Sequence, residues 1–181
     1  MRLRGSAMCR TRSRLGSDLL SRLLFFGAIL GCLTLDQLTK WWVVGNLPPY
    51  SSVDVLSWLS PVLSFTFVEN TGVVFGLFPG LGNLFTLLSS LVVVGILAFR
   101  RTLPSSELWV HASLGLVTGG AVGNFVDRVL RGFVVDFFDV NLWPFREWPV
   151  FNIADAAIVV GVMILLVDSF LAEREGVPQS V

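Results

Sequence analysis

Four long apolar stretches alternate with polar or proline-rich segments along the chain. They run from about 19 to 44, 84 to 99, 108 to 130 and 151 to 171. Stretches of about 20 apolar residues are long enough to cross the hydrocarbon core of a bilayer as helices. The pattern therefore predicts an all-α integral membrane protein with four transmembrane helices.

The third stretch differs from the others because it is rich in glycine. Gly119, Gly120 and Gly123 supply small residues at the spacing that lets two membrane helices approach closely. We therefore expect the third helix to pack tightly against its neighbours.

The connecting segments predict a small amount of other structure. Prolines and glycines break any long helix between residues 45 and 82. Within this segment, residues 62–68 (VLSFTFV) partly alternate and contain β-branched and aromatic residues, which favours a short strand. We expect a short interfacial helix over Ser52–Leu59 and an aromatic-rich loop over 131–150. The sequence thus predicts a small β and loop subdomain between the first two helices.

Basic residues indicate which ends of the helices face the cytoplasm. Six of the 13 Lys and Arg residues lie within the first 22 positions, and Arg100–Arg101 separate the second and third stretches. Cytoplasmic segments carry an excess of Lys and Arg, so we expect both termini in the cytoplasm and the β subdomain outside. Residues 1–18 then form a basic arm without regular structure, 19–171 the membrane domain and 172–181 a cytoplasmic tail.

Composition agrees with a membrane location. Hydrophobic residues make up 54% of the 181 residues and charged residues 14%, whereas average soluble proteins carry about 25% charged residues. A basic arm beside an apolar helix is more typical of a membrane-flanking segment than of nucleic-acid binding. We therefore expect membrane lipid, and no nucleic acid, as a partner.

Polar side chains gather near the predicted outer ends of the helices. Ionisable groups inside a bilayer cost roughly 2.5–3.5 kcal/mol each at its centre and mark functional sites. Asp36 and Lys40 are four positions apart, Asn152 and Asp155 three, and Asn124 lies three before Asp127 and four before Arg128, so the members of each group lie on the same side of their helix. The group comprises Asp36, Lys40, Asn124, Asp127, Arg128, Asp136, Asn152 and Asp155.

Two sets of these charges have an ordinary explanation. Asp36 with Lys40, and Asp127 with Arg128, are interpreted as pairs whose opposite charges make burial tolerable. Substrate contact would be a secondary role for them.

Asp136 and Asp155 differ, because no basic residue lies close to either in the sequence. Two carboxyl groups held close together cannot both ionise, so one keeps its proton. The ionised group can then deprotonate a water molecule while the protonated one polarises a carbonyl. This chemistry requires no metal and no other cofactor. The alternative is that Asp155 only caps the fourth helix or binds a cation.

Five short motifs follow one another along the chain. They are DQLTK at 36–40, ENTGVVF at 69–75, GGAVGNFVDR at 119–128, VDFF at 135–138 and FNIAD at 151–155. In this order, and with the apolar stretches between them, they resemble the bacterial lipoprotein signal peptidase (signal peptidase II) family. The resemblance implies an aspartic endopeptidase of the bacterial inner membrane. We expect a monomer, and the predicted orientation puts its active site on the outer side. It would remove the signal peptide of prolipoproteins on the N-terminal side of a diacylglyceryl-modified cysteine.

The resemblance also implies roles for individual residues. Val73 and Val74 stand where the family has smaller residues, so we expect a narrower pocket. Ala156 stands where the family often has Ser. The catalytic pair would be Asp136 and Asp155, with substrate-binding or supporting roles for Asn70, Asn124, Arg128 and Asn152, and structural polar roles for Asp36, Lys40 and Asp127.

A membrane transporter or proton channel is the main alternative function. Such a protein is expected to place ionisable groups through the depth of the bilayer, whereas here they gather on one side. A serine peptidase would need a histidine near its nucleophile, but the single histidine, His111, lies at the other end of the third stretch. A zinc peptidase would need a His-Glu-x-x-His motif, which the sequence lacks. The sequence therefore favours the peptidase.

Overall fold

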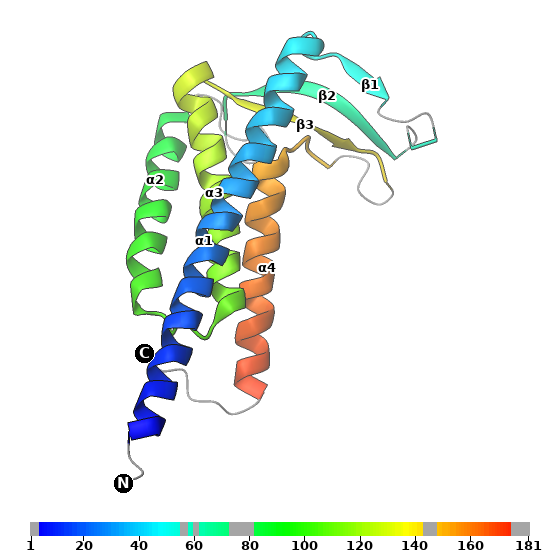
Figure 1. The fold of residues 1–181 in the computed structure, drawn as a ribbon. Coiled ribbons are helices and arrows are strands. Elements are labelled where there is room, and N and C mark those ends of the chain that lie inside the picture. The colour runs from blue at the N-terminus through cyan, green and yellow to red at the C-terminus, as the bar shows by residue number, and fades with distance from the viewer. Residues whose placement is uncertain (1–3, 55–57, 60–61, 73–81, 143–147, 175–181) are drawn as a thin grey trace.

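A bundle of four helices carries a small antiparallel sheet at one end (Figure 1). The computed structural model describes the backbone of residues 4–54, 58–59, 62–72, 82–142 and 148–174, with the side chains of the first two helices described from residues 16 and 84. The elements in chain order are α1 (Arg4–Asn46), β1 (Ser52–Asp54), β2 (Leu63–Asn70), α2 (Gly82–Phe99), the 3-10 turn η2 (Arg100–Thr102), α3 (Leu108–Arg131), β3 (Val134–Val140) and α4 (Ile153–Arg174).

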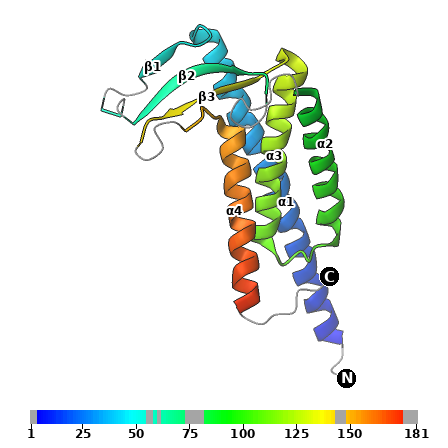
Figure 2. The same cartoon turned by 180° about the vertical axis from the view of Figure 1, so that it is seen from behind.

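Three helical segments in the described part of the chain are long and apolar enough to cross a membrane. They are Gly16–Asn46, Leu84–Thr102 and Ile153–Arg174. The third helix, α3, is 24 residues long, but its glycines and polar residues lower its hydropathy. It packs against α1, α2 and α4, so much of its surface faces protein (Figures 1 and 2). The predicted helical membrane fold is confirmed, while the fourth span stays a prediction.

The glycines of α3 allow the close packing that the sequence predicts. A Cβ atom at Gly119 would lie 3.0 Å from the Cβ of Cys32 and 3.1 Å from the Cα of Ile29, both on α1. A Cβ at Gly123 would lie 2.7 Å from an oxygen of Asp36 and 3.3 Å from Ala154 on α4. Both distances at Gly119, and the oxygen contact at Gly123, are shorter than ordinary van der Waals contacts. Small residues are therefore required where α3 meets both neighbours.

The sheet has the order β1-β2-β3, with both neighbouring pairs antiparallel. The predicted strand at 62–68 is confirmed as β2. Two other expectations are wrong. Ser52–Asp54 forms β1 rather than the start of a helix, because it pairs with β2. Residues 134–140 form β3 rather than part of a loop, so the sheet joins the segment between α1 and α2 to the segment between α3 and α4.

A small apolar core fixes the sheet to the bundle. Phe67 of β2 and Val135 and Phe137 of β3 are buried together with Val43 and Leu47 at the end of α1. Val68 pairs with Asp136 across the sheet. The position of Asp136 is therefore set by the pairing of β3 with β2 and by the packing of Val135 and Phe137 against the end of α1.

The N-terminal arm also departs from expectation. The helix α1 begins at Arg4, so the basic arm is helical and continues the first apolar stretch. Its lower end extends beyond the ends of the other helices (Figure 1). Serine, alanine and arginine residues do not interrupt a helix as Pro would, which explains the continuation.

Candidate functional site

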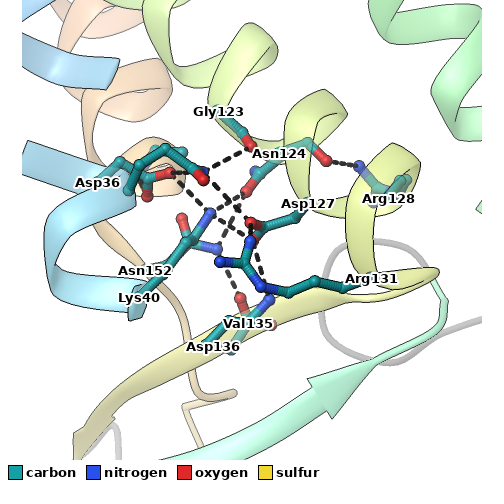
Figure 3. A network of polar contacts seen from close by, with 12 residues as sticks. Asp36, Lys40, Gly123, Asn124, Asp127, Arg128, Arg131, Val135, Asp136 and Asn152 are labelled. Carbon is teal, nitrogen blue, oxygen red and sulfur yellow. Dashed lines mark hydrogen bonds and ion pairs between the residues drawn. The ribbon is translucent and has the colours of Figure 1, made fainter. Parts of the chain in front are cut away.

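Most of the predicted site residues meet where α1, α3, β3 and the start of α4 come together (Figure 3). Asn70, at the end of β2, and Asp155 of α4 join them through hydrogen bonds to Asp136 and Asn124. They form one connected set of hydrogen bonds and ion pairs, although they come from distant parts of the sequence. The set contains Asn70, Asn124, Arg128, Asn152, Asp36, Lys40, Asp127, Asp136 and Asp155. The side chains therefore lie together in the fold, as the sequence predicts.

Three members of this set, together with Arg131, form a group of four charged side chains that we call the ion network. Lys40 Nζ lies 2.8 Å from Asp36 Oδ2 and 2.9 Å from Asp127 Oδ2, and all three side chains are fully buried. The guanidinium of Arg131 pairs with the other oxygen of Asp127. The predicted Asp127–Arg128 pair is wrong, because consecutive helix residues point in different directions whereas residues four apart share a face. Arg131 was missed in the sequence, although its spacing from Asp127 could have indicated it.

The ion network also holds the elements on which the site is built. Asp36 Oδ1 accepts a hydrogen bond of 2.9 Å from the backbone N–H of Ala154, at the start of α4. Asp127 Oδ2 accepts one of 3.1 Å from the backbone N–H of Val135, next to Asp136 in β3. Buried N–H groups need such partners. The two carboxylates thus anchor α4 and β3 to α1 and α3.

Lys40 also orients an amide of the site. Its Nζ lies 2.9 Å from Asn124 Oδ1. An ammonium group only donates hydrogen bonds, so the amide must turn its oxygen toward Lys40 and its NH2 group away. That NH2 group donates to Asp155 Oδ1 at 2.7 Å. The charge of Lys40 therefore determines which group of Asn124 faces Asp155.

Asn152 orients the second carboxyl group. Its Oδ1 accepts from the backbone N–H of Asp155 at 2.9 Å, and Asp155 Oδ2 accepts from the backbone N–H of Asn152 at 3.2 Å. This reciprocal arrangement is a capping box at the start of α4. Because Asn152 Oδ1 is used in the cap, its NH2 group faces Asp136 Oδ1 at 2.6 Å. Asp155 does cap α4, as the alternative interpretation expected, but its Oδ1 also accepts a hydrogen bond from Asn124, and its side chain lines the same cavity as Asp136.

Asp136 and Asp155, which we call the carboxyl pair, are held only by amides and backbone N–H groups in the described residues. Asp136 Oδ2 accepts from Asn70 Nδ2 at 2.8 Å, and its side chain is 2% exposed. Among the described residues, neither member forms an ion pair with Lys or Arg. Burial, and then the charge of Asp155, raise the pKa of Asp136 to about 7. A carboxyl group with this pKa can hold a proton near neutral pH.

A cavity of about 580 Å³ opens beside the carboxyl pair. Its polar lining includes both members together with Asn70, Asn124 and Arg128. Most of the remaining wall is apolar and includes Phe85, Trp148, Phe151 and Val159. A mostly apolar pocket with a few convergent polar groups is the usual form of a binding site.

Arg128 lies on the wall of this cavity rather than in the ion network. Its guanidinium donates to the backbone oxygens of Asn124 and Gly72, both at 3.4 Å. These contacts join α3 to the residues that follow β2. They are long for hydrogen bonds, so the guanidinium retains donor capacity toward the cavity.

Five further residues bear on the sequence predictions. Val73 and Val74, for which a narrower pocket was expected, lie outside the described residues, whereas Ala156 lines the cavity. Asp139 accepts a hydrogen bond of 2.7 Å from Thr66 and, among the described hydrogen bonds, takes no part in the set of contacts around the carboxyl pair.

His111 is buried in the first turn of α3, at the opposite end of that helix from Asp127.

Sequence comparisons agree with these features. Residues 28–171 match the model of the family described as signal peptidase (SPase) II. The lipoprotein signal peptidase of Syntrophomonas wolfei is 40% identical over 143 residues, which cover 79% of this chain and 90% of the relative. That of Psychromonas ingrahamii is 36% identical over 157 residues, which cover 84% of this chain and 87% of the relative.

Comparison with solved structures gives the same result for the fold. A bacterial membrane enzyme solved at 2.3 Å resolution superposes with a TM-score of 0.77 and 27% identity, over 89% of this chain and 93% of its own. A second, solved at 1.9 Å resolution, has a TM-score of 0.70 and 28% identity, over 82% of this chain and 90% of its own. With a family match over most of its length and relatives above one third identity, this chain belongs to the signal peptidase II family.

Proposed function

We propose that the protein is an intramembrane aspartic endopeptidase that removes the signal peptide of diacylglyceryl-modified prolipoproteins. Cleavage occurs on the N-terminal side of the lipid-modified cysteine. The observation that carries the proposal is the carboxyl pair, which has no cationic partner among the described residues and lies on the wall of an apolar cavity. Membership of the signal peptidase II family supports the substrate class.

The carboxyl pair supplies both the base and the acid of peptide hydrolysis. The pair holds one proton, because the raised pKa of Asp136 keeps a carboxyl group protonated near neutral pH. The ionised member accepts a proton from a water molecule, and the oxygen of this water attacks the scissile carbonyl carbon. The protonated member donates to the carbonyl oxygen, and a proton then passes to the leaving amine as the C–N bond breaks. No metal or cofactor takes part in this scheme.

The neighbouring amides keep the pair in position during the reaction. Asn70, Asn124 and Asn152 donate to carboxyl oxygens through hydrogen bonds of 2.6 to 2.8 Å. Lys40 orients the amide of Asn124, the cap of α4 orients that of Asn152, and the backbone N–H of Gly72 donates to Asn70 Oδ1. These contacts restrict rotation of the carboxyl groups. Fixed donors of this kind stabilise developing charge without reorganisation.

Arg128 and the apolar wall are assigned to substrate binding. The guanidinium fork can hold a backbone carbonyl of the peptide or an oxygen of the lipid headgroup. The apolar lining of the cavity suits the hydrocarbon part of a lipid-modified substrate. Such a cavity beside the acids excludes bulk water from the reacting bond.

The proposed setting is the bacterial inner membrane, crossed four times by a monomer with both termini in the cytoplasm. The distribution of Lys and Arg supports this orientation, and it places the sheet and the carboxyl pair on the outer side. Reporter fusions at residue 103 should show a cytoplasmic location, and fusions at residue 53 or 143 an outer one. The reverse pattern would contradict the orientation.

Incubation of the purified protein with a diacylglyceryl-modified prolipoprotein tests the function. We expect a product whose mass corresponds to cleavage immediately before the modified cysteine. The matched control is the same precursor without the diacylglyceryl group, which should stay intact. Failure to cleave the modified precursor by folded protein would contradict the proposal.

A further inference from the structure

The end of the bundle opposite the carboxyl pair carries a second arrangement of charge and aromatic rings. The guanidinium carbon of Arg100, in η2, lies 4.2 Å from the ring centre of Phe25 and 5.2 Å from that of Phe26. Phe25 is fully buried and packs with Val110 and Leu114 of α3. The aromatic contact therefore holds this cation against α1.

Arg100 has hydrogen-bonding capacity that the described residues do not use. Its Nε atom is buried and has no hydrogen-bond partner, and no described carboxylate forms an ion pair with it. Buried polar atoms without a partner are rare and call for an explanation such as a missing ligand. Guanidinium groups offer donors in a fork that matches phosphate oxygens.

A second cation lies near this group. Arg22, three residues before Phe25 on α1, is exposed, and its positive charge acts on Arg100. Asp18, one turn earlier on α1, and Glu107, before α3, are the acidic groups nearest in sequence to these elements, and neither forms an ion pair with Arg22 or Arg100. Two cations that repel each other without a carboxylate between them favour the binding of an anion.

The surface of α1 beside Arg22 indicates what kind of anion would bind. Leu19, Leu23, Phe26 and Leu30 follow one another at helical spacing and are each 55–67% exposed. They form an apolar stripe that runs past Arg22 and includes Phe26, over whose ring Arg100 lies. A free phosphate would leave this stripe unused, whereas the acyl chains of a phospholipid would cover it.

We propose that Arg22 and Arg100 bind the phosphate of an anionic phospholipid whose acyl chains lie along the Leu19–Leu30 stripe of α1. This site is separate from the substrate cavity and depends on the proposed function only for its assignment to the cytoplasmic leaflet. That leaflet is where juxtamembrane basic residues meet anionic headgroups. The bound lipid would join α1 to the turn between α2 and α3.

Lipid titration of detergent-purified protein, followed by native mass spectrometry and thermal unfolding, tests the site. We expect phosphatidylglycerol to bind and to raise the unfolding temperature more than phosphatidylcholine or inorganic phosphate does. Arg22→Gln and Arg100→Gln should each weaken phosphatidylglycerol binding about fivefold, because each basic residue near an anionic headgroup contributes about 1 kcal/mol. Arg101→Gln, at the next position of η2, is the control and should bind as the wild type does.

Two results would overturn the site. One is equal binding of phosphatidylglycerol by the wild type and by the Arg22→Gln/Arg100→Gln double variant. The other is equal stabilisation by inorganic phosphate, which would indicate an ion site without a lipid. If Arg100→Gln does not fold, Arg100→Lys keeps the charge without the fork and should still bind phosphatidylglycerol more weakly than the wild type. Because no readout uses cleavage, failure here is distinguishable from failure of the proposed peptidase.

Discussion

The ion network and the carboxyl pair are joined by hydrogen bonds, yet their buried charged groups have different kinds of partner. In the ion network, Lys40 and Arg131 neutralise Asp36 and Asp127 at ion-pair distance. In the carboxyl pair, amides and backbone N–H groups are the partners, and no described cation forms an ion pair with either member. The first arrangement stabilises charge in one fixed state, whereas the second leaves a proton free to move.

This difference suggests separate roles within one polar cluster: the ion network supports the fold, and the carboxyl pair is assigned the chemistry. Charged groups buried in pairs resist any change of protonation, because each would leave its partner uncompensated. Two carboxyl groups that face a cavity can exchange a proton with water and substrate. We therefore expect changes in the ion network to act on folding and changes in the carboxyl pair to act on cleavage.

The largest effect is expected in the carboxyl pair. Asp136→Asn and Asp155→Asn keep size and polarity but remove the base or the acid, so each should lower cleavage at least about a thousandfold. The double change should be little worse than either, because the two groups act as one unit. The measurement is the cleavage rate of lipid-modified precursor at matched amounts of folded enzyme.

Asp139→Asn is the matched control for these variants, since Asp139 lies on the same strand and bonds only Thr66 among the described hydrogen bonds. It should keep substantial activity. Activity lost in Asp139→Asn but kept in Asp136→Asn would mean that the wrong carboxylate of β3 had been assigned.

The second effect concerns the stability that the ion network provides. Lys40→Met leaves Asp36 buried without a cation, which should lower the free energy of unfolding by roughly 3–5 kcal/mol. Combining it with Asp36→Asn removes the uncompensated charge and should recover part of this loss. Denaturant unfolding of the single and double variants measures the difference. An unchanged midpoint for Lys40→Met would show that the pair contributes nothing to the fold.

The third effect is a dependence on pH. The pKa of Asp136 is about 7, so the pair loses its proton as pH rises through that value. Cleavage should therefore fall about tenfold per pH unit above it, because only the singly protonated pair is active. A rate that stays constant from pH 6 to 9 would contradict the shared proton.

The same raised pKa predicts the sign of a stability change. An acid whose pKa is higher in the folded state destabilises the fold progressively from about pH 4 to 7, and fully above 7. Asp136→Asn removes this cost but places an NH2 group against one of the two amide donors that face Asp136, so its effect on stability should be more favourable at pH 8 than at pH 4. Thermal unfolding of both proteins at the two pH values checks the sign.

The smallest effect is expected at Arg128, on the cavity wall. Arg128→Lys keeps the charge but loses the fork, so cleavage should fall about tenfold with little change in unfolding, as for loss of one charged hydrogen bond. Arg131→Lys is the matched control on the same helix, because it retains the ion pair with Asp127 and should keep its activity. If both lysine variants are fully active, Arg128 contributes only its charge.

The helices could be predicted from sequence because long apolar stretches need no knowledge of their partners. The strand β3 was missed because Val134 to Phe137 are all buried, so the run lacks the alternation that reveals a strand with one exposed face. The strand β1 has three exposed residues, and only its pairing with β2 orders it. Both strands therefore depend on contacts with segments that are distant in the sequence.

The contacts of the site could likewise be predicted only in part from the sequence. Spacing and unpaired charge were sufficient to select the carboxyl pair as candidates. The orientation of the Asn124 amide was not predictable, because it depends on Lys40 from a different helix, 84 positions away in the sequence. The true partners of Asp127 likewise include Lys40, which only the folded chain brings within 2.9 Å. Contacts between distant elements therefore had to come from the structure.

The most direct test of the central claim is the cleavage rate per folded molecule in Asp155→Asn and Lys40→Met. Folded enzyme would be counted by size-exclusion chromatography and thermal unfolding, and cleavage followed with the same diacylglyceryl-modified precursor. We expect Asp155→Asn to be folded and inactive. Lys40→Met should be poorly folded, and its folded fraction should retain measurable but reduced cleavage, because the Asn124 amide loses the partner that orients it. A folded Asp155→Asn protein that cleaves at the wild-type rate would contradict the account.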